Sequence, residues 1–389
     1  MDTFGPSAPT VGIVGAGQLA RMTYQAAIPL GVRLRVLAER ADDSAARVAT
    51  DVTLGSARSG HDLAAFAAGC DVLTFDHELV DAAALAALEV AGRIVRPGAA
   101  AVAVAQDKRR QRAEFARLGF PVPAHRPVAG GADLLEFGAA HGWPAVAKVG
   151  RGGYDGRGVW ILADPAAAVA WWAAHGALGL EPLVEAWVPI EREIAVLVAR
   201  RPGGETVCYP PVETIQRDGI CRELLAPAPI PATLAREAEG LATGVAAAVG
   251  AVGMLAVELF VTGGRLVINE IAARPHNAGH HTIEGSVTSQ FAQHLRAVLD
   301  WPLGATAPTT PSAATVNLLG GPDGADPTQR LPAALAVPGA HVHLYAKAAR
   351  PGRKLGHVTA LGPTPDEARA RARRAAALLT GGASVEGFG

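Results

Sequence analysis

Two acidic residues, Glu258 and Glu270, lie in two short apolar runs, residues 254–260 and 265–271, which a pair of glycines joins. This pattern predicts a β-hairpin with one carboxylate on each strand and the amide of Asn269 beside the second. An apolar strand buries a carboxylate only when another group pairs with it. Two carboxylates and an amide are oxygen ligands that suit Mg²⁺ held between a protein and phosphates. We therefore expect a metal site on the hairpin; two acids that face water at a sheet edge are the simpler alternative.

Lys148 lies at the end of an apolar run, residues 144–149, directly before a glycine-rich stretch at 150–158. Glycines let backbone N–H groups approach phosphates, and the lysine ammonium would supply a point charge to the same oxygens. The stretch lacks the G-K-[ST] ending of a Walker loop, and a flexible hairpin would also explain its glycines. The order of a lysine-bearing strand, a glycine loop and an acidic hairpin favours nucleotide binding.

An extended segment at 182–188 begins with an apolar run that leads to Glu185. Adenine needs an apolar slot and one or two backbone hydrogen bonds, and such a segment provides both. Glu193, on the next expected strand, could accept hydrogen bonds from ribose hydroxyls. Ordinary strand packing is the alternative for each of these residues.

Arg274 and His276 directly follow the acidic hairpin, and His280 and His281 come close behind. The arginine offers a two-pronged donor to a planar anion such as bicarbonate or a carboxylate. His276 could orient a group or transfer a proton. The neighbouring oxygen ligands favour Mg²⁺ over a transition metal, which the histidines alone would suit.

A glycine turn, Gly15-Ala-Gly17, follows the apolar run 11–14 and opens a helix. Ala20 takes the place of the third glycine of a dinucleotide fingerprint, and Glu39 ends the next strand where a ribose-binding acid belongs, so NAD binding stays open. A phosphate ester on the backbone amides of the helix start would satisfy the same glycines. The absence of an obvious hydride-transfer site later in the sequence favours the phosphate ester.

The chain has 389 residues, a net charge of −1 and an apolar half. These numbers indicate several domains and neither a nucleic-acid surface nor a polybasic membrane surface. Three isolated cysteines fit no zinc or redox spacing, and residues 1–10 lack the features of a signal peptide, so we expect a cytoplasmic protein. Four cations stand out at 347–354. They form either a solvated loop or a site for a substrate phosphate: Lys347, Arg350, Arg353 and Lys354.

Alternating strand and helix patterns predict a doubly wound parallel sheet in the first 100 residues or so, and a helix over 105–118. The uncharged run 240–257 reaches membrane-spanning length, but its glycines divide it into a helix, a turn and a strand. A linker is expected at about 305–325. The expected domains are an N-terminal Rossmann-like unit (1–104), a small α+β lid (105–185), a central α+β unit with the metal site (186–305) and a small β-rich unit (306–389).

Together these motifs resemble the ATP-grasp superfamily and, within it, the family of 5-(carboxyamino)imidazole ribonucleotide synthetases. Four stretches carry the resemblance: 15–22, 152–158, 269–280 and 345–357. It implies an α/β ATP-grasp fold and a homodimeric ligase of purine synthesis. Such a ligase uses ATP, Mg²⁺ (or Mn²⁺) and bicarbonate to carboxylate aminoimidazole ribonucleotide through carboxyphosphate. A formate-dependent glycinamide ribonucleotide transformylase is the nearest rival, although Gln18 and Asn277 favour carboxylation. An NAD-dependent oxidoreductase and a non-catalytic nucleotide sensor are the others.

The resemblance also implies roles for single residues. Glu258 and Glu270 would bind the metal. ATP would contact Lys108, Lys148, Gly153, Tyr154, Asp155, Gly156, Arg157, Gly158, Glu185, Ala186, Trp187, Val188, Glu193, Gln216, Asn269 and Glu270. The ribonucleotide would contact Gln18, Leu19, Glu78, Tyr154, Asp155, Arg157, Asn277, Lys347, Arg353 and Lys354. The expected catalytic residues are Arg274, His276, Asn277 and Asp155.

The sequence departs from the family pattern at several positions. Lys108 stands where many members have arginine, and Gln216 where many have a nucleotide-contacting histidine. Asp76 and His77 precede Glu78 in place of the usual acid-aromatic pair. Ala273 and Ala346 replace the commoner proline and glycine. None of these changes removes an expected metal or phosphate ligand.

Overall fold

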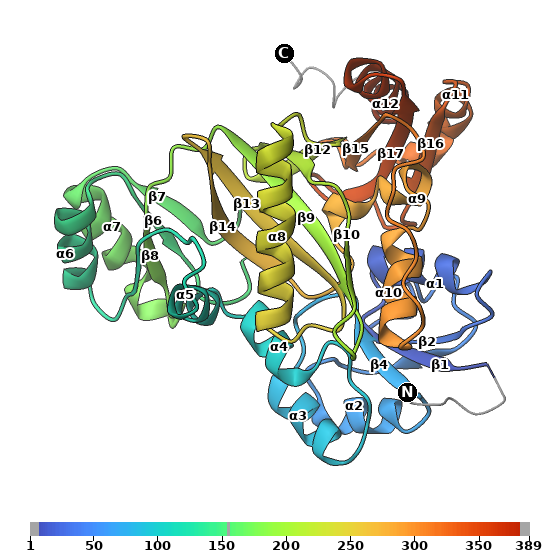
Figure 1. Ribbon diagram of the computed structural model, residues 1–389, viewed down its shortest axis with the longest axis horizontal. Helices are drawn as coiled ribbons and strands as arrows, with labels where there is room; N and C mark the ends of the chain where they lie inside the picture. The colour runs from blue at the N-terminus through green and yellow to red at the C-terminus, as the bar shows by residue number, and fades with distance from the viewer. Residues whose placement is uncertain (1–7, 154–155, 382–389) are drawn as a thin grey trace.

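The computed structural model describes residues 8–153 and 156–381. Its N-terminal part is a four-stranded parallel sheet in the order β3-β2-β1-β4 with helices packed around it (Figure 1), which confirms the doubly wound prediction. The glycine turn comes directly after β1, so the start of α1 lies at the carboxyl edge of the sheet. The elements are β1 (Thr10–Val14), α1 (Gln18–Ala27), β2 (Arg33–Ala38), β3 (Val52–Leu54), α2 (Gly60–Ala67), β4 (Val72–Phe75), α3 (Ala82–Val90) and α4 (Ala99–Ala105).

The next unit is a small lid that lies to one side of the molecule, at the left of Figure 1. The helix expected over 105–118 begins only at Lys108, because the Asp107 carboxylate caps it by accepting from the Arg109 N–H at 3.0 Å. Four antiparallel strands follow in the order β5-β8-β6-β7. The elements are α5 (Lys108–Arg117), β5 (His125–Pro127), α6 (Gly131–His141), β6 (Ala145–Lys148), β7 (Val159–Leu162), α7 (Pro165–His175), η1 (Gly176–Leu178) and β8 (Leu183–Ala186).

A large antiparallel sheet forms the rest of the molecule, in the order β14-β13-β9-β11-β12-β15-β17-β16 with β10 beside β9. Its strands are β9 (Arg192–Arg200), β10 (Thr206–Cys208), β11 (Val212–Arg217), β12 (Ile220–Ala226), β13 (Gly253–Thr262), β14 (Arg265–Ala272), β15 (Ser312–Leu319), β16 (Ala340–Leu344) and β17 (Lys354–Gly362). The remaining helices are α8 (Ala232–Ala248), η2 (Asn277–Gly279), α9 (Thr282–Gly285), α10 (Gln290–Val298), η3 (Pro327–Arg330), α11 (Leu331–Leu335) and α12 (Pro365–Thr380). The uncharged run 240–257 divides into the end of α8 and the start of β13, as expected.

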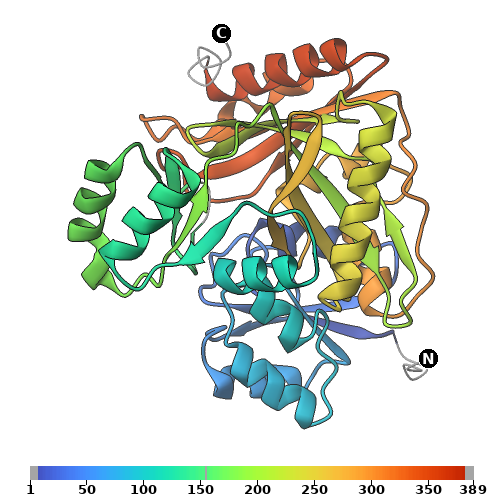
Figure 2. The same cartoon turned by 60° about the vertical axis from the view of Figure 1, so that its left-hand side comes forward.

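The linker expected at about 305–325 is wrong. Residues 312–319 form β15, which is buried along its whole length and pairs with β12 on one side and β17 on the other. The C-terminal strands therefore continue the sheet of the central unit, and α12 covers them on its outer face (Figure 2). No helix in the described part of the chain is both long enough and apolar enough to span a membrane.

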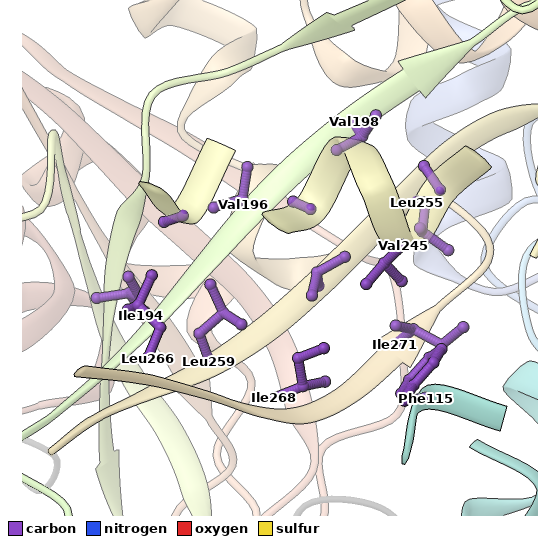
Figure 3. Close-up of a cluster of buried hydrophobic side chains, with 14 of the residues drawn as sticks. Phe115, Ile194, Val196, Val198, Val245, Leu255, Leu259, Leu266, Ile268 and Ile271 are labelled. Atoms are coloured by element: carbon purple, nitrogen blue, oxygen red, sulfur yellow. The ribbon is translucent and has the colours of Figure 1, made fainter. Parts of the chain in front are cut away.

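The hairpin of β13 and β14 takes its rigidity from the apolar core on one face of this sheet. Figure 3 shows Leu255, Leu259 and Ile268 of the hairpin packed with side chains of β9 and α8 and with Phe115 of α5. Leu255 and Leu259 are each about 1% exposed. Because side chains alternate along a strand, this packing turns Glu258 to the opposite face.

Ala346 has a left-handed backbone, with a φ of 53°. This conformation costs a residue with a Cβ about 1–2 kcal/mol. Glycine avoids that strain but adds freedom to the unfolded chain. We therefore predict that Ala346→Gly stabilises the protein by about 0.5–1 kcal/mol, measured by chemical denaturation. The same change at Ala348, which lies outside the left-handed region, should destabilise it; equal effects of the two changes would contradict the prediction.

Candidate functional site

The predicted acidic hairpin is confirmed. Glu258 of β13 lies directly opposite Glu270 of β14, next to a register shift in the hairpin. Their side chains are only 20% and 34% exposed. The Asn269 amide donates to Glu258 Oε2 at 3.3 Å, and the Lys108 ammonium pairs with Glu270. Two carboxylates from neighbouring strands thus share one partly enclosed space.

A buried ion-pair cluster adjoins the hairpin from the lid side. Lys148 lies 2.7 Å from one carboxylate oxygen of Glu185 and donates to Asn269 Oδ1 at 3.2 Å. Arg112 lies 2.5 Å from the other oxygen of Glu185 and donates to the Asn269 carbonyl at 2.6 Å. Glu185 therefore ties α5, β6 and β14 together.

The pKa values in this cluster follow from burial and from the neighbouring charges. Burial would raise the pKa of Glu185, but Lys148 and Arg112 outweigh it and hold that pKa at about 2. Burial, with Lys148 and Arg112 nearby, lowers the pKa of Lys108 to about 8. Burial is also the largest cause that raises the pKa of Glu258. A cation beside Glu258 would relieve that cost.

The donor set of the hairpin fits a hard divalent cation. Glu258, Glu270 and the side-chain oxygen of Asn269 are all oxygen donors on adjacent positions. Among the described residues, no group of three His, Cys, Asp or Glu side chains could hold a metal alone. Two carboxylates are the usual protein share of a Mg²⁺ site whose other ligands come from phosphates and water.

Arg274 and His276 both face acids of the site. Arg274 donates from Nε to Glu78 at 2.8 Å and from Nη1 to the Pro275 carbonyl at 3.0 Å. His276 Nδ1 accepts from the Ala278 N–H at 3.3 Å, while Nε2 lies 3.4 Å from Glu258. Burial, with Arg274 nearby, lowers the pKa of His276 to about 3. The neutral ring therefore lies beside the Glu258 carboxylate without forming an ion pair with it. Proton transfer by His276, one of the two expected roles, does not follow from this geometry.

Glu193 lies at the far side of the hairpin, where β9 pairs with β13 opposite Phe260. Burial and the charge of Glu258 raise its pKa to about 7, against a hydrogen bond from Gln216 that lowers it. Gln216 thus contacts Glu193 directly. The two side chains form one polar unit on β9 and β11.

The phosphate ester expected on the glycine turn at Gly15–Gly17 does not fit. The Asp76 carboxylate accepts from the Gly17 N–H at the start of α1. A Cβ on Gly15 would come 2.0 Å from Asp76 Oδ1, so the glycine is needed for this close approach. The anion site of the helix start is thus filled by the chain's own acid. The same contact removes the donor that a dinucleotide would use, which counts against the NAD alternative.

The basic cluster lies beside this turn, as expected. The Lys347 ammonium contacts Gln18 Oε1 at the start of α1. Burial, together with Arg353, lowers the pKa of Lys347 to about 8, while Asp76 acts in the opposite direction. Lys354 is close enough to act on Lys347 and also on Glu258. The cluster therefore connects the glycine turn with the acidic hairpin.

Some expected ligand contacts have side chains that do not face the acidic hairpin or the basic cluster. The side chain of Leu19 is 6% exposed and packs with Met22, Phe291 and Tyr345, so a ligand could meet only its main chain. The Glu185 carboxylate turns away from the segment 186–188 into the ion-pair cluster. Ala186 is half-buried at the end of β8, Trp187 is exposed and Val188 follows it half-buried. Asn277 begins η2 directly after His276.

The glycine loop of the lid lies against the central sheet. Gly156 has a φ of 73°, and a Cβ there would come 2.8 Å from the backbone of Gly219, in the turn between β11 and β12. Gly153 and Gly158 lie close to Val149, and Arg157 is exposed on the loop. Tyr154 and Asp155 lie outside the described residues. This contact between Gly156 and Gly219 therefore places the lid loop against the turn that follows Gln216.

Three residues that hold the site together had no signal in the sequence: Arg112, Asp76 and Gln290. Gln290 accepts from the His276 N–H at 2.8 Å and donates to the His276 carbonyl at 2.7 Å. Arg112 sits in an ordinary charged helix, 73 residues before its partner Glu185. Asp76 and Arg112 lie 59 and 73 residues from their partners, and Gln290 reaches back across irregular chain to His276, so no repeating pattern could reveal these contacts.

Three domain families match the chain. Residues 8–106 match the ribonucleotide synthetase preATP-grasp domain, residues 113–291 the ATP-grasp domain and residues 313–371 the phosphoribosylaminoimidazole carboxylase C-terminal domain. The match with the middle domain covers Lys148 and the acidic hairpin. Fold and site together define an ATP-grasp ligase.

Comparison with individual proteins identifies the family within this class of ligases. The N5-carboxyaminoimidazole ribonucleotide synthase of Mycobacterium tuberculosis H37Rv is 47% identical over 386 residues, which are 98% of this chain and 90% of the relative. The crystal structure of the synthetase from Thermus thermophilus is 38% identical, with a TM-score of 0.85 over 96% of this chain and 98% of that one. The Aspergillus clavatus synthase in complex with ADP and 5-aminoimidazole ribonucleotide is 32% identical, with a TM-score of 0.87 over 96% and 99%. The chain belongs to the N5-carboxyaminoimidazole ribonucleotide synthase family, as the sequence motifs predicted.

The raised pKa of Glu193 predicts a pH-dependent stability. Below its usual pKa near 4.5 the carboxyl is protonated in both states, so burial costs little. As pH rises through about 7, the folded protein must ionise a buried acid, and stability is lost. We expect Glu193→Gln to melt about 2–4 °C above the parent at pH 8 and at nearly the same temperature near pH 4. Thermal melts between these pH values test this, and a pH-independent difference would contradict it.

Proposed function

We propose that the chain catalyses the ATP- and bicarbonate-dependent carboxylation of 5-aminoimidazole ribonucleotide in purine synthesis, with release of ADP and phosphate. The observation that carries the proposal is the acidic hairpin flanked by two buried lysines on one side and by Arg274 on the other. Phosphate transfer needs positive charge around the transferred group and an anion acceptor beside it. The reported relatives are synthases of this family, which favours carboxylation over formyl transfer.

The nucleotide lies between the lid and the large sheet in this proposal. Lys108 and Lys148 contact its phosphates, together with backbone N–H groups of the loop that includes Gly153, Gly156 and Gly158. The segment 185–188 supplies backbone contacts to adenine, and Glu193 accepts from the ribose. Glu258 and Glu270 would hold Mg²⁺ or Mn²⁺, which neutralises the charge that develops during transfer.

Bicarbonate binds at Arg274. Glu78 uses the Nε edge of the guanidinium, and no hydrogen bond among the described residues uses Nη2, which leaves donors for a planar anion. A bicarbonate oxygen attacks the terminal phosphorus of ATP. The bond to the ADP oxygen breaks, and carboxyphosphate forms. His276 lies beside Glu258 during this step.

The carboxyl group then passes to the exocyclic amine of the ribonucleotide. The C–N bond forms as the C–O bond to phosphate breaks, and the amine loses a proton. Carboxyphosphate hydrolyses readily, so the lid must exclude water before it forms. Arg157 belongs to the lid loop, so its contact with the ribonucleotide would couple recognition to closure; Asp155, the other expected contact of this stretch, lies outside the described residues. Lys347, Arg353 and Lys354 bind its phosphate, with Gln18, Glu78 and Asn277 nearby.

We further propose a cytoplasmic homodimer. Cys70, Cys208 and Cys221 are free thiols, as in a reducing compartment. Ile28, directly after α1, and Val90 of α3 are 68% and 91% exposed on the N-terminal unit, which gives that unit apolar surface for a second copy.

Glu270→Gln should reduce ADP formation by about 100-fold or more, because the amide is a poor ligand for the metal that balances transition-state charge. ADP release with bicarbonate and aminoimidazole ribonucleotide measures the loss. Glu191→Gln serves as the matched control, since Glu191 accepts from Gly263 at the tip of the same hairpin. Circular dichroism should show both variants folded. Retained turnover in Glu270→Gln would refute the metal assignment.

Lys347→Ala should raise the KM for the ribonucleotide about tenfold and leave the KM for ATP nearly unchanged, because a phosphate monoester loses its buried cation. Steady-state kinetics with each substrate varied in turn separate the two effects. Arg350→Ala, on the exposed part of the same loop, should change neither value. Equal effects on both substrates would place Lys347 away from the ribonucleotide phosphate.

A further inference from the structure

Three imidazoles form a buried stack at the junction of the C-terminal strands with the segment after the acidic hairpin. The ring of His357 lies between those of His343 and His280, with centroids 4.5 Å and 4.7 Å away. His357 and His343 are paired positions on β17 and β16, while His280 precedes α9. Figure 1 shows α9 beside these two strands. His343 is fixed in turn by Glu284 at 2.7 Å.

Tyr345 links this stack to the N-terminal unit. Its hydroxyl hydrogen-bonds to His357 Nδ1 at 2.7 Å, and its carbonyl accepts from the Ser44 hydroxyl at 2.6 Å. Its ring is 1% exposed and packs against Leu19 and Met22 of α1. The tyrosine is therefore held at both ends, by the stack and by the domain that carries the glycine turn.

Lys347 depends on this tyrosine. Its ammonium lies 5.7 Å from the centre of the Tyr345 ring, over the ring face, and reaches Gln18 from there. Only Ala346, in its left-handed conformation, separates the two residues. Displacement of the ring would move the backbone of 345–347 and with it the ammonium.

The other side of the stack leads toward the acidic hairpin. The Gln290 amide lies 3.4 Å from His280 Nδ1, and the same side chain holds the N–H and the carbonyl of His276. His276 faces Glu258 at 3.4 Å. One continuous set of contacts therefore runs from Lys347 to His276, which lies beside a hairpin carboxylate.

We propose that Tyr345 and His357 are positioning residues that hold Lys347 at a fixed place relative to the acidic hairpin, and so set the affinity for the phosphate of the ribonucleotide. Neither residue touches the reacting atoms. The substrate named here rests on the proposed function. The stack itself supplies rigidity. Glu284 holds His343 at one end, Gln290 contacts His280 at the other, and His357 is fixed between them by ring stacking and by its hydrogen bond with Tyr345.

Tyr345→Phe tests the proposal with the smallest change, because it removes the hydroxyl and keeps the ring. The KM for aminoimidazole ribonucleotide should rise about three- to tenfold, as expected for one lost hydrogen bond. The KM for ATP should stay within about twofold of the parent value. Thr359→Val is the matched control: it removes a hydroxyl that is equally buried on β17, bonded to Thr315 at 2.8 Å. It should lower the melting temperature and change neither KM.

A second pair of variants separates positioning from loss of stability. His357→Asn keeps a hydrogen-bonding atom near the place of Nδ1, while His357→Gln puts one near the place of Nε2. Both lose the ring, so both should melt lower. The KM for the ribonucleotide should lie closer to the parent value in His357→Asn. If Tyr345→Phe changes both KM values equally, or neither, the positioning role is refuted.

A substrate-independent measurement keeps this test distinct from that of the proposed function. Lys347 is acetylated with acetic anhydride above pH 9, and peptide mass spectrometry then measures the extent of modification. The rate of acetylation reports how accessible the side-chain nitrogen of Lys347 is. Acetylation should be faster in Tyr345→Phe than in the parent and unchanged in Thr359→Val. If the three proteins label as expected but the parent enzyme does not carboxylate the ribonucleotide, the proposed substrate is wrong and the positioning role of Tyr345 is still supported. If all three proteins label equally, the positioning role is refuted.

Discussion

The site depends on a balance of buried charge at the junction of the lid and the large sheet. Three cations face three carboxylates there: Lys108, Lys148 and Arg112 against Glu185, Glu258 and Glu270. Arg112 and Glu185 are 1% and 3% exposed. A buried charge that loses its partner typically costs a protein about 3–5 kcal/mol, so no member can be removed without consequence for the others. In the proposed function a triphosphate would bring further negative charge into this space, and a divalent cation on the hairpin would restore the balance.

The continuous sheet gives this balance a fixed frame. The hairpin forms one edge of it and the strands that carry the basic cluster form the other, in an unbroken order from β14 to β16. The acidic hairpin and the basic cluster therefore belong to one hydrogen-bonded sheet, which holds the proposed metal site and the proposed phosphate site in one frame. The lid has its own four-stranded sheet and meets the large one at Gly156 and through Glu185. In the proposed function the lid is therefore the part that would open for the nucleotide and close over carboxyphosphate.

The sequence predicted those parts of the structure that short-range patterns encode. The acidic hairpin has its two carboxylates 12 residues apart, with glycines at the turn, so period and turn chemistry sufficed. The pairs Arg112–Glu185 and Ser44–Tyr345 are 73 and 301 residues apart, and nothing local marks either member. The linker error has a related cause. Proline and threonine dominate 305–311, and the short apolar run that follows gives no sign that it lies between two distant strands.

The glycine turn shows how one local pattern can support the wrong ligand. Small residues after β1 are required, but the group that approaches them is the Asp76 carboxylate, not a phosphate. A carboxylate at a helix start repels a second anion there, so a phosphate near α1 must be held by other cations. Lys347 is such a cation. It contacts Gln18 at the first turn of α1, and the charge of Asp76 acts to raise its pKa. The acid attracts the lysine, and the lysine, held above Tyr345, has further N–H donors for the phosphate that we propose it binds. The same turn that in a dinucleotide-binding domain would bind a pyrophosphate directly thus acts here by placing a cation.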